Sequence, residues 1–527
     1  MLYFLQALKI SALTVNIGLR IISSKLIICT KYYMSKNQNS QNYETDILIV
    51  GAGIMGATLA SILKEINANL RVDIIESLNK PALESSYAYN NAGTGHAGYC
   101  ELNYTPLLPN NKIDTHKALQ INSEFEISLQ YWSYLTKKYR SFKPKKFIKR
   151  TPHISLVYGD KNISYLKKRY LALRSSPLFE TIEFSSNSKN IEKWIPLLKS
   201  KKLLEKYAAT KVEMGTDVNF GEITYQLISI LKTKKNFCLR TNHKLTDINE
   251  NNDGSWSVKL NGGKKINANF IFIASGGDSL KILQKTKVHE QSGYAGFPVN
   301  GQWLICKNPK VVAMHKAKVY GKAEIGSPPM SAPHLDLRVI DGKDILMFGP
   351  FASFTSKFLI SGSFFDFIGS IKFHNLKTLL MVFLKEWPLV IYLIKQSFKN
   401  HRSRMNDLKK FYPEANSKDW QLEKAGIRVQ IMKQDKKKVP KLEFGTEIIF
   451  SQKNNLAALL GASPGASISV KSMIEVTERC LLHKSKSNNW KKKIKKMIPS
   501  YEIDLNKNPS LLRKIRSRNQ KTLGINL

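Results

Sequence analysis

Three glycines near the start of the chain have the spacing of a turn that can hold phosphate groups. The turn follows a short apolar run at residues 46–50 and precedes a stretch of helical character at 57–64. In that setting the first glycine allows a tight turn, the second lets the backbone approach a pyrophosphate, and the third lets the helix pack closely on the strand. The N-terminal amides of the helix then face the negative charge. This pattern predicts a dinucleotide site formed by Gly51, Ala52, Gly53 and Gly56.

A carboxylate at the end of the next predicted strand completes this site. Residues 70–75 form a second apolar run of strand type, which leads into Glu76, 25 residues after Gly51. A carboxylate in this position can accept hydrogen bonds from a ribose of the bound dinucleotide. We therefore include Glu76 among the predicted cofactor-binding residues.

The elements after the second strand distinguish FAD from NAD. Residues 245–260 alternate like a small antiparallel meander with a turn at Asp253 and Gly254, and residues 270–277 form a buried strand that runs into glycines. A dinucleotide fold that is interrupted by a meander and then returns by such a strand resembles the glutathione-reductase-like FAD fold. We predict a mixed α/β protein of this class, with an FAD-binding Rossmann fold, an interleaved substrate-binding domain and FAD as cofactor.

Further segments of the chain closely resemble those of one enzyme family. They are residues 86–106, 215–221, 326–338, 339–343, 348–351, 425–430, 460–467, 497–501 and 511–516. In these segments the chain is similar to the malate:quinone oxidoreductases, and the resemblance covers roughly residues 45–527. It implies FAD-dependent oxidation of (S)-malate to oxaloacetate with electron transfer to a membrane quinone. That reaction feeds the tricarboxylic acid cycle and the respiratory chain.

Two other functions stay open from the sequence. One is a different flavin-dependent 2-hydroxy-acid dehydrogenase, such as one for L-2-hydroxyglutarate, because the segments around His96 and Arg428 are shared in outline with such enzymes. The other is a basic scaffold or nucleic-acid-binding protein that keeps a degenerate flavin fold.

Two arginines lie in the segments most like the family, and malate carries two carboxylates. Arginine suits a carboxylate because its planar guanidinium donates two parallel hydrogen bonds and stays charged. The resemblance implies that Arg338 and Arg428 hold the substrate carboxylates. The alternative for Arg338 is a salt bridge, for example with Asp336.

Oxidation of a secondary alcohol also needs a base that takes the hydroxyl proton, and histidine is suited because its ordinary pKa lies near physiological pH. Two histidines, His96 and His334, lie inside the family-like segments. His96 is the first candidate for the base, because residues 91–98 resemble the flavin-edge loop of related flavoproteins. His334 is the second candidate, or it closes the pocket.

Residues in the flavin-edge loop and in a turn near the C-terminus are expected to contact the flavin. In the flavin-edge loop they permit close backbone approach to the ring. Near the C-terminus a strand-to-helix turn can direct amides toward the flavin edge where negative charge accumulates on reduction. The expected contacts are Asn91, Gly93, Thr94, Gly95, Gly461, Ser463 and Gly465.

The order of these segments predicts a discontinuous domain organisation. The FAD-binding domain is expected to comprise residues 45–105, 206–285 and 422–480, and the substrate-binding domain residues 106–205 and 286–421. Residues 1–44 form a basic N-terminal extension, and residues 481–527 form a basic helical C-terminal segment.

Composition limits the cellular setting. The five cysteines include no C-x-x-C pair, which disfavours a zinc ribbon or a disulfide framework, and we predict no metal site. The first 43 residues contain no acid and five basic residues, a pattern typical of an organellar presequence. We predict a peripheral protein on the matrix side of the mitochondrial inner membrane, with the cytoplasmic face of a bacterial plasma membrane as the alternative.

The net charge of +42 indicates either an anionic partner or a compositional bias toward lysine. Residues 481–527 hold 13 Lys or Arg and two acids, which suits anionic lipid headgroups. No nucleic-acid-binding motif accompanies them, and we predict no nucleic acid partner. Residues 378–394 are strongly apolar but contain Lys385, Glu386 and Pro388, so two short helices are expected, packed in the core or lying on a membrane surface.

Overall fold

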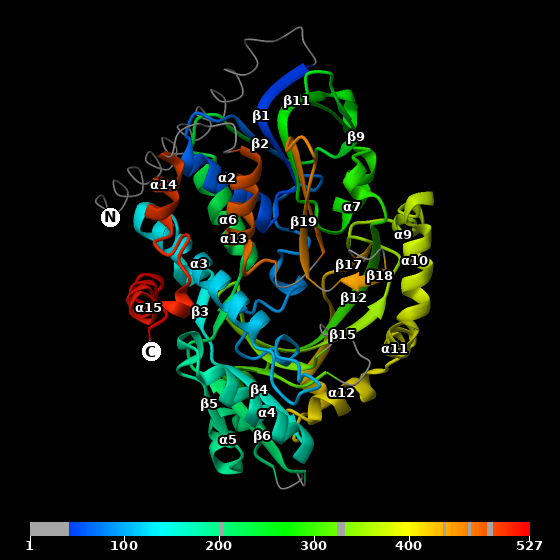
Figure 1. The fold of residues 1–527 in the computed structure, drawn as a ribbon. Helices are drawn as coiled ribbons and strands as arrows, with labels where there is room; N and C mark the ends of the chain where they lie inside the picture. Colours follow the sequence, from blue (N-terminus) through cyan, green and yellow to red (C-terminus); the bar gives the residue numbers. More distant parts are fainter. Residues whose placement is uncertain are drawn as a thin grey trace, which may run out of the picture.

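The computed structural model describes residues 42–200, 205–323, 332–435, 439–443, 445–461, 465–481 and 489–526. Two sheets run side by side through the molecule, and helices cover their outer faces (Figure 1). The predicted N-terminal extension lies outside the described residues up to position 41. The first strand begins at Asn42, slightly before the predicted start of the folded part.

The first sheet is the predicted dinucleotide-binding sheet. Its strands follow the order β19-β20-β11-β1-β2-β8, and the pairs from β20 to β8 are parallel. The meander β9–β10 pairs with β11, as the pattern at 245–260 predicts. The strands are β1 (Asn42–Val50), β2 (Val72–Ile75), β8 (Phe237–Arg240), β9 (Leu245–Glu250), β10 (Trp256–Leu260), β11 (Lys265–Ile273), β19 (Thr446–Phe450) and β20 (Leu456–Gly461).

The second sheet is mostly antiparallel, with the order β18-β17-β12-β15-β14-β13-β4-β6-β5 and β16 beside β12. Its strands are β4 (His153–Tyr158), β5 (Glu183–Ser185), β6 (Tyr207–Val212), β12 (Ala295–Cys306), β13 (Lys318–Tyr320), β14 (His334–Ile340), β15 (Lys343–Phe354), β16 (Trp420–Lys424), β17 (Arg428–Gln434) and β18 (Pro440–Glu443). A two-stranded sheet joins β3 (Ile148–Arg150) to β7 (Thr216–Val218).

The domain boundaries at residue level stay a prediction. The first sheet takes its strands from the segments that we assign to the FAD-binding domain. Within those segments, however, β6, β17 and β18 pair in the second sheet. The chain therefore passes between the two sheets inside the predicted FAD-binding segments.

Alternation along β1 places one set of side chains on each face of the first sheet. Ile47 and Ile49 face α2 and α6, whereas Leu48 and Val50 face the meander and α7. Both faces are buried, as expected for a mainly parallel sheet. The helices are α2 (Ile54–Ile66), α3 (His116–Lys138), α4 (Asp160–Arg174), α5 (Ser188–Trp194), α6 (Phe220–Leu231), α7 (Ser279–Lys285), α8 (Pro309–Ala313), α9 (Asp366–Gly369), α10 (Phe373–Lys385), α11 (Trp387–Ser397), α12 (His401–Lys409), α13 (Ser469–Val476), α14 (Asn489–Met497) and α15 (Pro509–Leu523).

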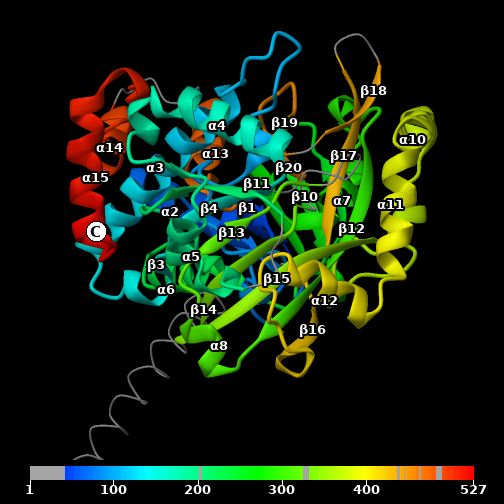
Figure 2. The ribbon, with the colours of Figure 1, turned by 90° about the horizontal axis from the view of Figure 1, so that it is seen from below.

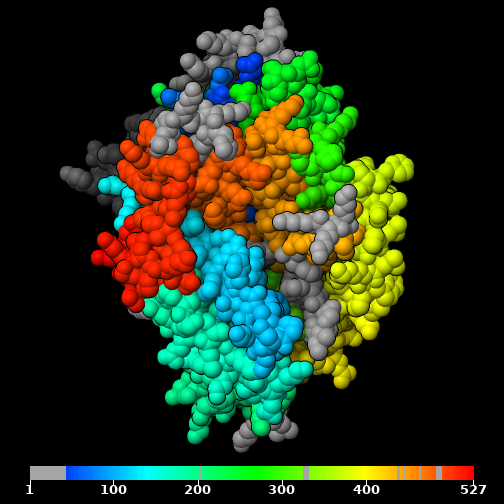
Figure 3. All heavy atoms as spheres, in the orientation of Figure 1, coloured from blue at the N-terminus to red at the C-terminus, as the bar shows by residue number. Residues whose placement is uncertain are grey.

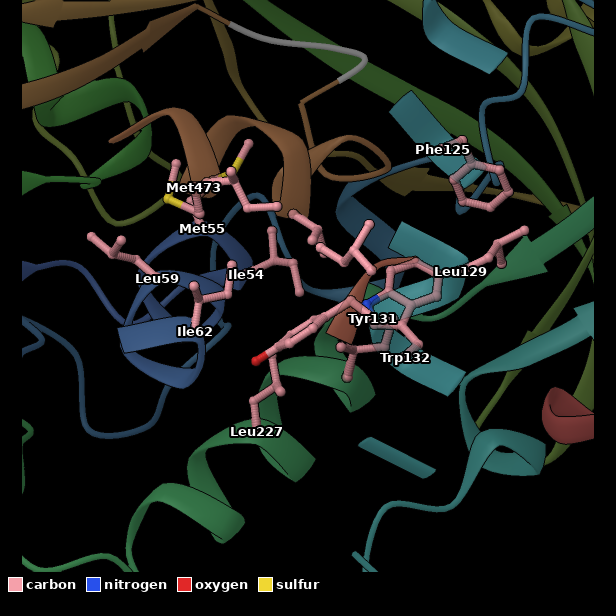
Figure 4. Packing of buried hydrophobic residues seen from close by; sticks show 14 of the residues in the cluster. Ile54, Met55, Leu59, Ile62, Phe125, Leu129, Tyr131, Trp132, Leu227 and Met473 are labelled. Carbon is pink, nitrogen blue, oxygen red and sulfur yellow. The ribbon is translucent and has the colours of Figure 1, made fainter. Parts of the chain in front are cut away.

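The largest apolar cluster holds segments from the two ends of the chain together. Leu59 on α2, Trp132 on α3, Leu227 on α6 and Met473 on α13 pack in one buried group (Figure 4). All four are almost completely removed from solvent, so each contributes about 1.5–3 kcal/mol by burial. This packing fixes the N-terminus of α2 relative to α13, the two elements that begin beside the predicted cofactor site.

The apolar stretch near residue 380 forms two helices, as predicted. α10 and α11 meet at Glu386, with Pro388 in the first turn of α11, where its missing amide hydrogen costs nothing. They pack on the second sheet through a cluster that includes Leu379, Val382 and Leu393. Within the described ranges, none of the helices combines the length and apolar character needed to span a bilayer.

Candidate active site

A cavity of about 450 Å³ lies where the two sheets meet and contains most of the predicted site residues. Its wall includes ten of them: Gly51, Gly53, Glu76, Asn91, Gly93, Thr94, His96, Arg428, Gly461 and Gly465. Ala52, Gly56, Gly95, His334 and Arg338 are not part of its lining. The predicted contact Ser463 lies outside the described residues.

The glycine turn has the geometry that the motif requires. Gly51 has φ +111°, and a Cβ there would lie 2.4 Å from the carbonyl oxygen of Ala274. A Cβ at Gly56 would lie 2.2 Å from the Gly51 oxygen, which explains the close packing of α2 on β1. Gly53 and the first residues of α2 line the cavity, so the positive end of the helix faces it.

Glu76 lines the same cavity just after the end of β2, where a ribose is expected. Its carboxylate accepts hydrogen bonds from the amides of Ala52 and Leu78, each at 2.9 Å. These bonds fix the side chain at the end of β2. Ala52 therefore supports the site by holding Glu76, although its own side chain is outside the cavity wall.

The predicted flavin-edge loop, residues 91–98, contributes residues 91–94 and His96 to the cavity wall. The Asn91 side chain closes the loop, because its Oδ1 accepts from the Gly93 amide at 2.9 Å. Gly93 has φ +58°, and a Cβ there would lie 2.2 Å from the Arg338 guanidinium carbon. A Cβ at Gly95 would lie 2.0 Å from Thr216 Oγ1. The two glycines are thus required by packing beneath the loop.

Ser467, which the sequence did not single out, connects this loop to the start of α13. Its hydroxyl accepts from the His96 amide and donates to the Thr94 carbonyl, both at 3.0 Å. Ser128 on α3 donates to the Ser467 carbonyl at 2.6 Å. Ser467 lies two residues after Gly465 in a family-like segment, which was the available signal.

The His96 ring lines the cavity between two tyrosines. Its centroid is 6.4 Å from that of Tyr104 and 6.4 Å from that of Tyr320. Within the described residues, no hydrogen-bond partner is found for its ring nitrogens. Burial lowers the pKa of His96 to about 3, and the nearby His153 and His334 act in the same direction. The imidazole is therefore neutral at physiological pH.

His334 lies behind Tyr320 as seen from His96. Its ring stacks on the Tyr320 ring at 4.2 Å, and its Nδ1 is 2.8 Å from Asp336 Oδ2. The Tyr320 hydroxyl shares a hydrogen bond of 2.7 Å with Thr94 Oγ1. His334 thus supports the loop through Tyr320 and does not line the cavity.

Arg338 is completely buried beneath the flavin-edge loop. Its Nε is 2.8 Å from Asp217 Oδ1, and its Nη1 donates to the carbonyls of Ala88 and Asn91. The salt-bridge alternative for this arginine is therefore observed, but the partner is Asp217 and not Asp336. A guanidinium that is already bound to a carboxylate and two carbonyls holds the loop in place.

Lys318 extends this buried group of charges. Its Nζ is 2.9 Å from Asp217 Oδ1 and 3.5 Å from Asp336 Oδ2, and it donates to the Ala92 carbonyl at 2.9 Å. Although burial favours the neutral acid, His334 and Lys318 lower the pKa of Asp336 to about 2. Buried charges of this kind are tolerated only when paired, as they are here.

Arg428 differs from Arg338 because it is part of the cavity lining. It begins β17 and is half-buried. Burial lowers its pKa, yet a guanidinium remains protonated at any relevant pH. Within the described residues, no carboxylate or other acceptor is paired with its side chain. The cavity therefore contains a charged group ready to bind an anionic ligand.

The C-terminal helix supports the loop from the other side. Arg516 on α15 pairs with the buried Glu126 on α3 at 2.7 Å and donates to Asn122 Oδ1 at 3.2 Å. The Asn122 amide in turn donates to the Ala97 carbonyl, next to His96, at 2.8 Å.

Comparisons with known proteins agree on one family. The model of the malate:quinone oxidoreductase family matches residues 43–525. A probable malate:quinone oxidoreductase of Flavobacterium psychrophilum is 47% identical over 491 residues, covering 92% of this chain and 99% of its own. The Hahella chejuensis protein of the same description is 46% identical, covering 92% and 98%.

Solved structures support the fold. An L-α-glycerophosphate oxidase from Mycoplasma pneumoniae with FAD bound has a TM-score of 0.52 at 16% identity, covering 83% of this chain and 94% of its own. Glycine oxidase from Geobacillus kaustophilus has a TM-score of 0.55 at 14% identity, covering 85% and 96%. The predicted FAD-binding Rossmann fold and the predicted cofactor, FAD, are confirmed.

Proposed function

The chain belongs to the malate:quinone oxidoreductase family, and we propose that the cavity described above is where it oxidises malate. It is an FAD-dependent enzyme that converts (S)-malate to oxaloacetate and passes the electrons to a quinone. One observation carries the assignment of the site: a single cavity extends from the glycine turn and Glu76 to His96 and Arg428.

The cavity fits FAD by the chemistry of its wall. Glu76 would hold a ribose, and the glycine turn with the N-terminus of α2 would hold the pyrophosphate. The flavin-edge loop with Gly461 and Gly465 would hold the ring. When bound, FAD supplies the two-electron acceptor for alcohol oxidation.

The substrate contacts follow from His96 and Arg428, two wall residues whose side chains have no partner among the residues that the structure describes. Arg428 binds a malate carboxylate by a bidentate contact. His96, being neutral, accepts the proton of the malate hydroxyl. Arg338 and His334 act as positioning residues, since one holds Asp217 and the loop while the other pairs with Asp336.

A substrate panel tests this function directly. Anaerobic addition of malate to the purified yellow protein is expected to bleach the flavin absorbance, whereas L-2-hydroxyglutarate is expected to react far more slowly. Faster bleaching by L-2-hydroxyglutarate would support the other dehydrogenase. A colourless protein that gains no flavin absorbance on addition of FAD would favour the degenerate scaffold.

We predict that the FAD is bound without a covalent link. Of His96 and Cys100, which lie in or next to the flavin-edge loop in the sequence, Cys100 is buried outside the cavity lining and His96 lines it. Acid precipitation is expected to release the yellow chromophore into the supernatant. Colour that stays in the pellet would contradict this prediction and would implicate His96.

A membrane contact is proposed from the exposed face of α9, α10 and α11. The face carries exposed Lys372, Lys377, Lys385 and Lys395, whereas both acids of residues 354–399 are at least half-buried. Trp387 lies among its apolar residues, as is typical of a lipid interface. We define this helical face by its exposed apolar side chains: Ile368, Phe373, Leu376, Leu380, Met381, Leu384, Trp387, Ile391, Ile394 and Phe398.

The positions of the two segments argue against a membrane contact that the basic C-terminal segment and these helices make together. α14 and α15 lie on one side of the molecule and α9–α11 on the opposite side (Figures 2 and 3). One flat bilayer surface cannot touch both. Three of the five lysines of α14 are also engaged within the protein, because Lys491 and Lys495 pair with Glu502 and Lys493 donates to the Ile66 carbonyl.

Liposome sedimentation tests the helical face. The protein is expected to sediment with anionic liposomes at low salt and to be partly released by high salt, at roughly 1 kcal/mol per lysine near the surface. Changing Lys372, Lys377, Lys385 and Lys395 to Gln should remove the salt-dependent part. The matched control, with Lys491, Lys492 and Lys493 changed to Gln, should bind like the parent.

Two results would contradict this account. Equal binding to neutral and anionic liposomes at every salt concentration would exclude the electrostatic contribution. Loss of binding only in the α14 variant would transfer the contact to the C-terminal segment.

The cellular location stays a proposal. The relatives named above are bacterial, which fits attachment to the cytoplasmic face of a plasma membrane. The mitochondrial inner membrane is proposed from the acid-free N-terminal residues alone, and a role in the tricarboxylic acid cycle is proposed from the reaction of the family.

A further inference from the structure

A short loop, residues 358–365, separates the cofactor cavity from the helical face. Leu359 lines the cavity, and its Cδ2 would be 3.7 Å from a Cβ at Gly276. A Cβ at Gly277 would be 1.9 Å from the Phe358 carbonyl oxygen. The loop therefore packs directly on the glycines at the end of β11.

The loop is held in place by two carboxylates. Glu84, a cavity residue, accepts from the amides of Ile360 and Ser361 at 3.0 Å each. Asp366, buried at the start of α9, accepts from the amides of Phe358 and Ser363.

Asp366 also links the loop to the cavity wall. Its Oδ1 is 2.6 Å from Lys281 Nζ, and Lys281 lines the cavity. Lys281 and both carboxylates are occupied in this way, and the charge nearest the outer side of the loop is that of Lys357, whose Nζ lies 4.5 Å from the centroid of the Phe364 ring.

The outer side of the loop is apolar and exposed. Phe364 is 69% and Phe365 is 75% exposed, and Ile360 is also exposed. Phe367 packs between Phe354 and Phe383, so this surface continues into the helical face through α9 and α10. The patch reaches the cofactor cavity on one side and the helical face on the other. Exposed apolar patches of this kind usually mark a binding site.

We propose that the 358–365 loop is the docking site for the ring of the lipid-soluble quinone. The inference rests on the proposed function, because the helical face would place this loop at the bilayer surface. A planar, conjugated ring dione suits a surface of Phe364, Phe365 and Ile360 beside Leu359. Quinone reduction takes up two electrons and two protons, the number that malate oxidation releases, so no further reactant is needed.

Rapid mixing separates quinone docking from malate oxidation. The FAD-loaded protein is reduced with dithionite, freed of excess reductant, and mixed with a short-chain water-soluble quinone without vesicles. The double variant Phe364→Ser, Phe365→Ser is expected to be reoxidised at least about tenfold more slowly, because two apolar contacts with the ring are lost. Anaerobic reduction of the same variant by malate should match that of the parent.

The control is a pair of more exposed phenylalanines on the helical face. Phe373 is 100% and Phe398 is 83% exposed, and neither belongs to the loop. Phe373→Ser, Phe398→Ser should be reoxidised at the parental rate in solution. A second readout is photolabelling of the FAD-loaded protein with an azido-quinone, where peptides covering residues 358–368 are expected to carry the label.

The outcomes are distinct. Parental reoxidation of the loop variant, or label confined to other peptides, would overturn the docking site. Failure of the proposed function would instead show as no bleaching of the parent by malate, a result that leaves the dithionite experiment interpretable.

Discussion

Replacement of Arg428 by lysine is expected to weaken transition-state binding of malate by about 2–4 kcal/mol while FAD content stays unchanged. Arg428 lines the cavity, and within the described residues its guanidinium has no acceptor of its own. Lysine keeps the charge but cannot make two parallel hydrogen bonds to one carboxylate. The measurement is the anaerobic rate of flavin bleaching against malate concentration, together with the ratio of FAD to protein.

Arg338→Lys is the informative comparison for Arg428→Lys. Because Arg338 binds Asp217 and the carbonyls beneath the flavin-edge loop, its replacement is expected to lower FAD retention and thermal stability first. Arg402→Lys, at an exposed position on α12, should behave like the parent. Parental malate oxidation by Arg428→Lys would remove Arg428 from the substrate site.

The cofactor half of the site could be predicted because its signals are local. The glycine turn at Gly51–Gly56 and the carboxylate at Glu76 each follow a strand whose apolar run is evident in the sequence. The strand-turn-helix context fixes where these residues point before any tertiary contact is known. Gly51 and Glu76 accordingly line the same cavity, as predicted.

The buried charges could not be predicted in the same way. Asp217, Lys318 and Arg338 are far apart in the sequence and meet only because β7, β13 and β14 come together under the flavin-edge loop. Arg338 and Arg428 carry similar sequence signals, yet the fold buries one against a carboxylate and places the other in the cavity lining. Asp217 lies in a family-like segment, but its residue type gave no indication of its partner.

The relative placement of surface segments is also a property of the whole fold. Residues 378–394 and 481–527 each have a composition that suits a membrane. Composition carries no information about which side of the molecule a segment occupies. α10 packs on the second sheet, whereas α14 packs on α2 and α3, and this difference separates the two segments.

Replacement of His96 by glutamine is expected to slow malate oxidation by about 10²–10⁴-fold, the usual contribution of a general base. The flavin spectrum and FAD content should change little, because the His96 amide and not its ring binds Ser467. His334→Gln is expected to have the smaller effect, since His334 pairs with Asp336 behind Tyr320. A larger loss in His334→Gln would assign the base to the His334–Asp336 pair.

The low pKa of His96 gives this prediction a pH dependence with a definite sign. The pKa of His96 is about 3 in the folded protein and about 6.5 when exposed, so between these values the unfolded chain binds a proton that the folded one does not. The free energy of unfolding therefore decreases as the pH falls from about 7 toward 4. His96→Gln lacks the contribution of the His96 ring to this decrease. The stability of His96→Gln relative to the parent should therefore rise as the pH is lowered over that range, as measured by thermal unfolding. His116→Gln, at an exposed position, should show no such trend. A constant difference between His96→Gln and the parent would mean that the His96 ring is not held neutral in the cavity.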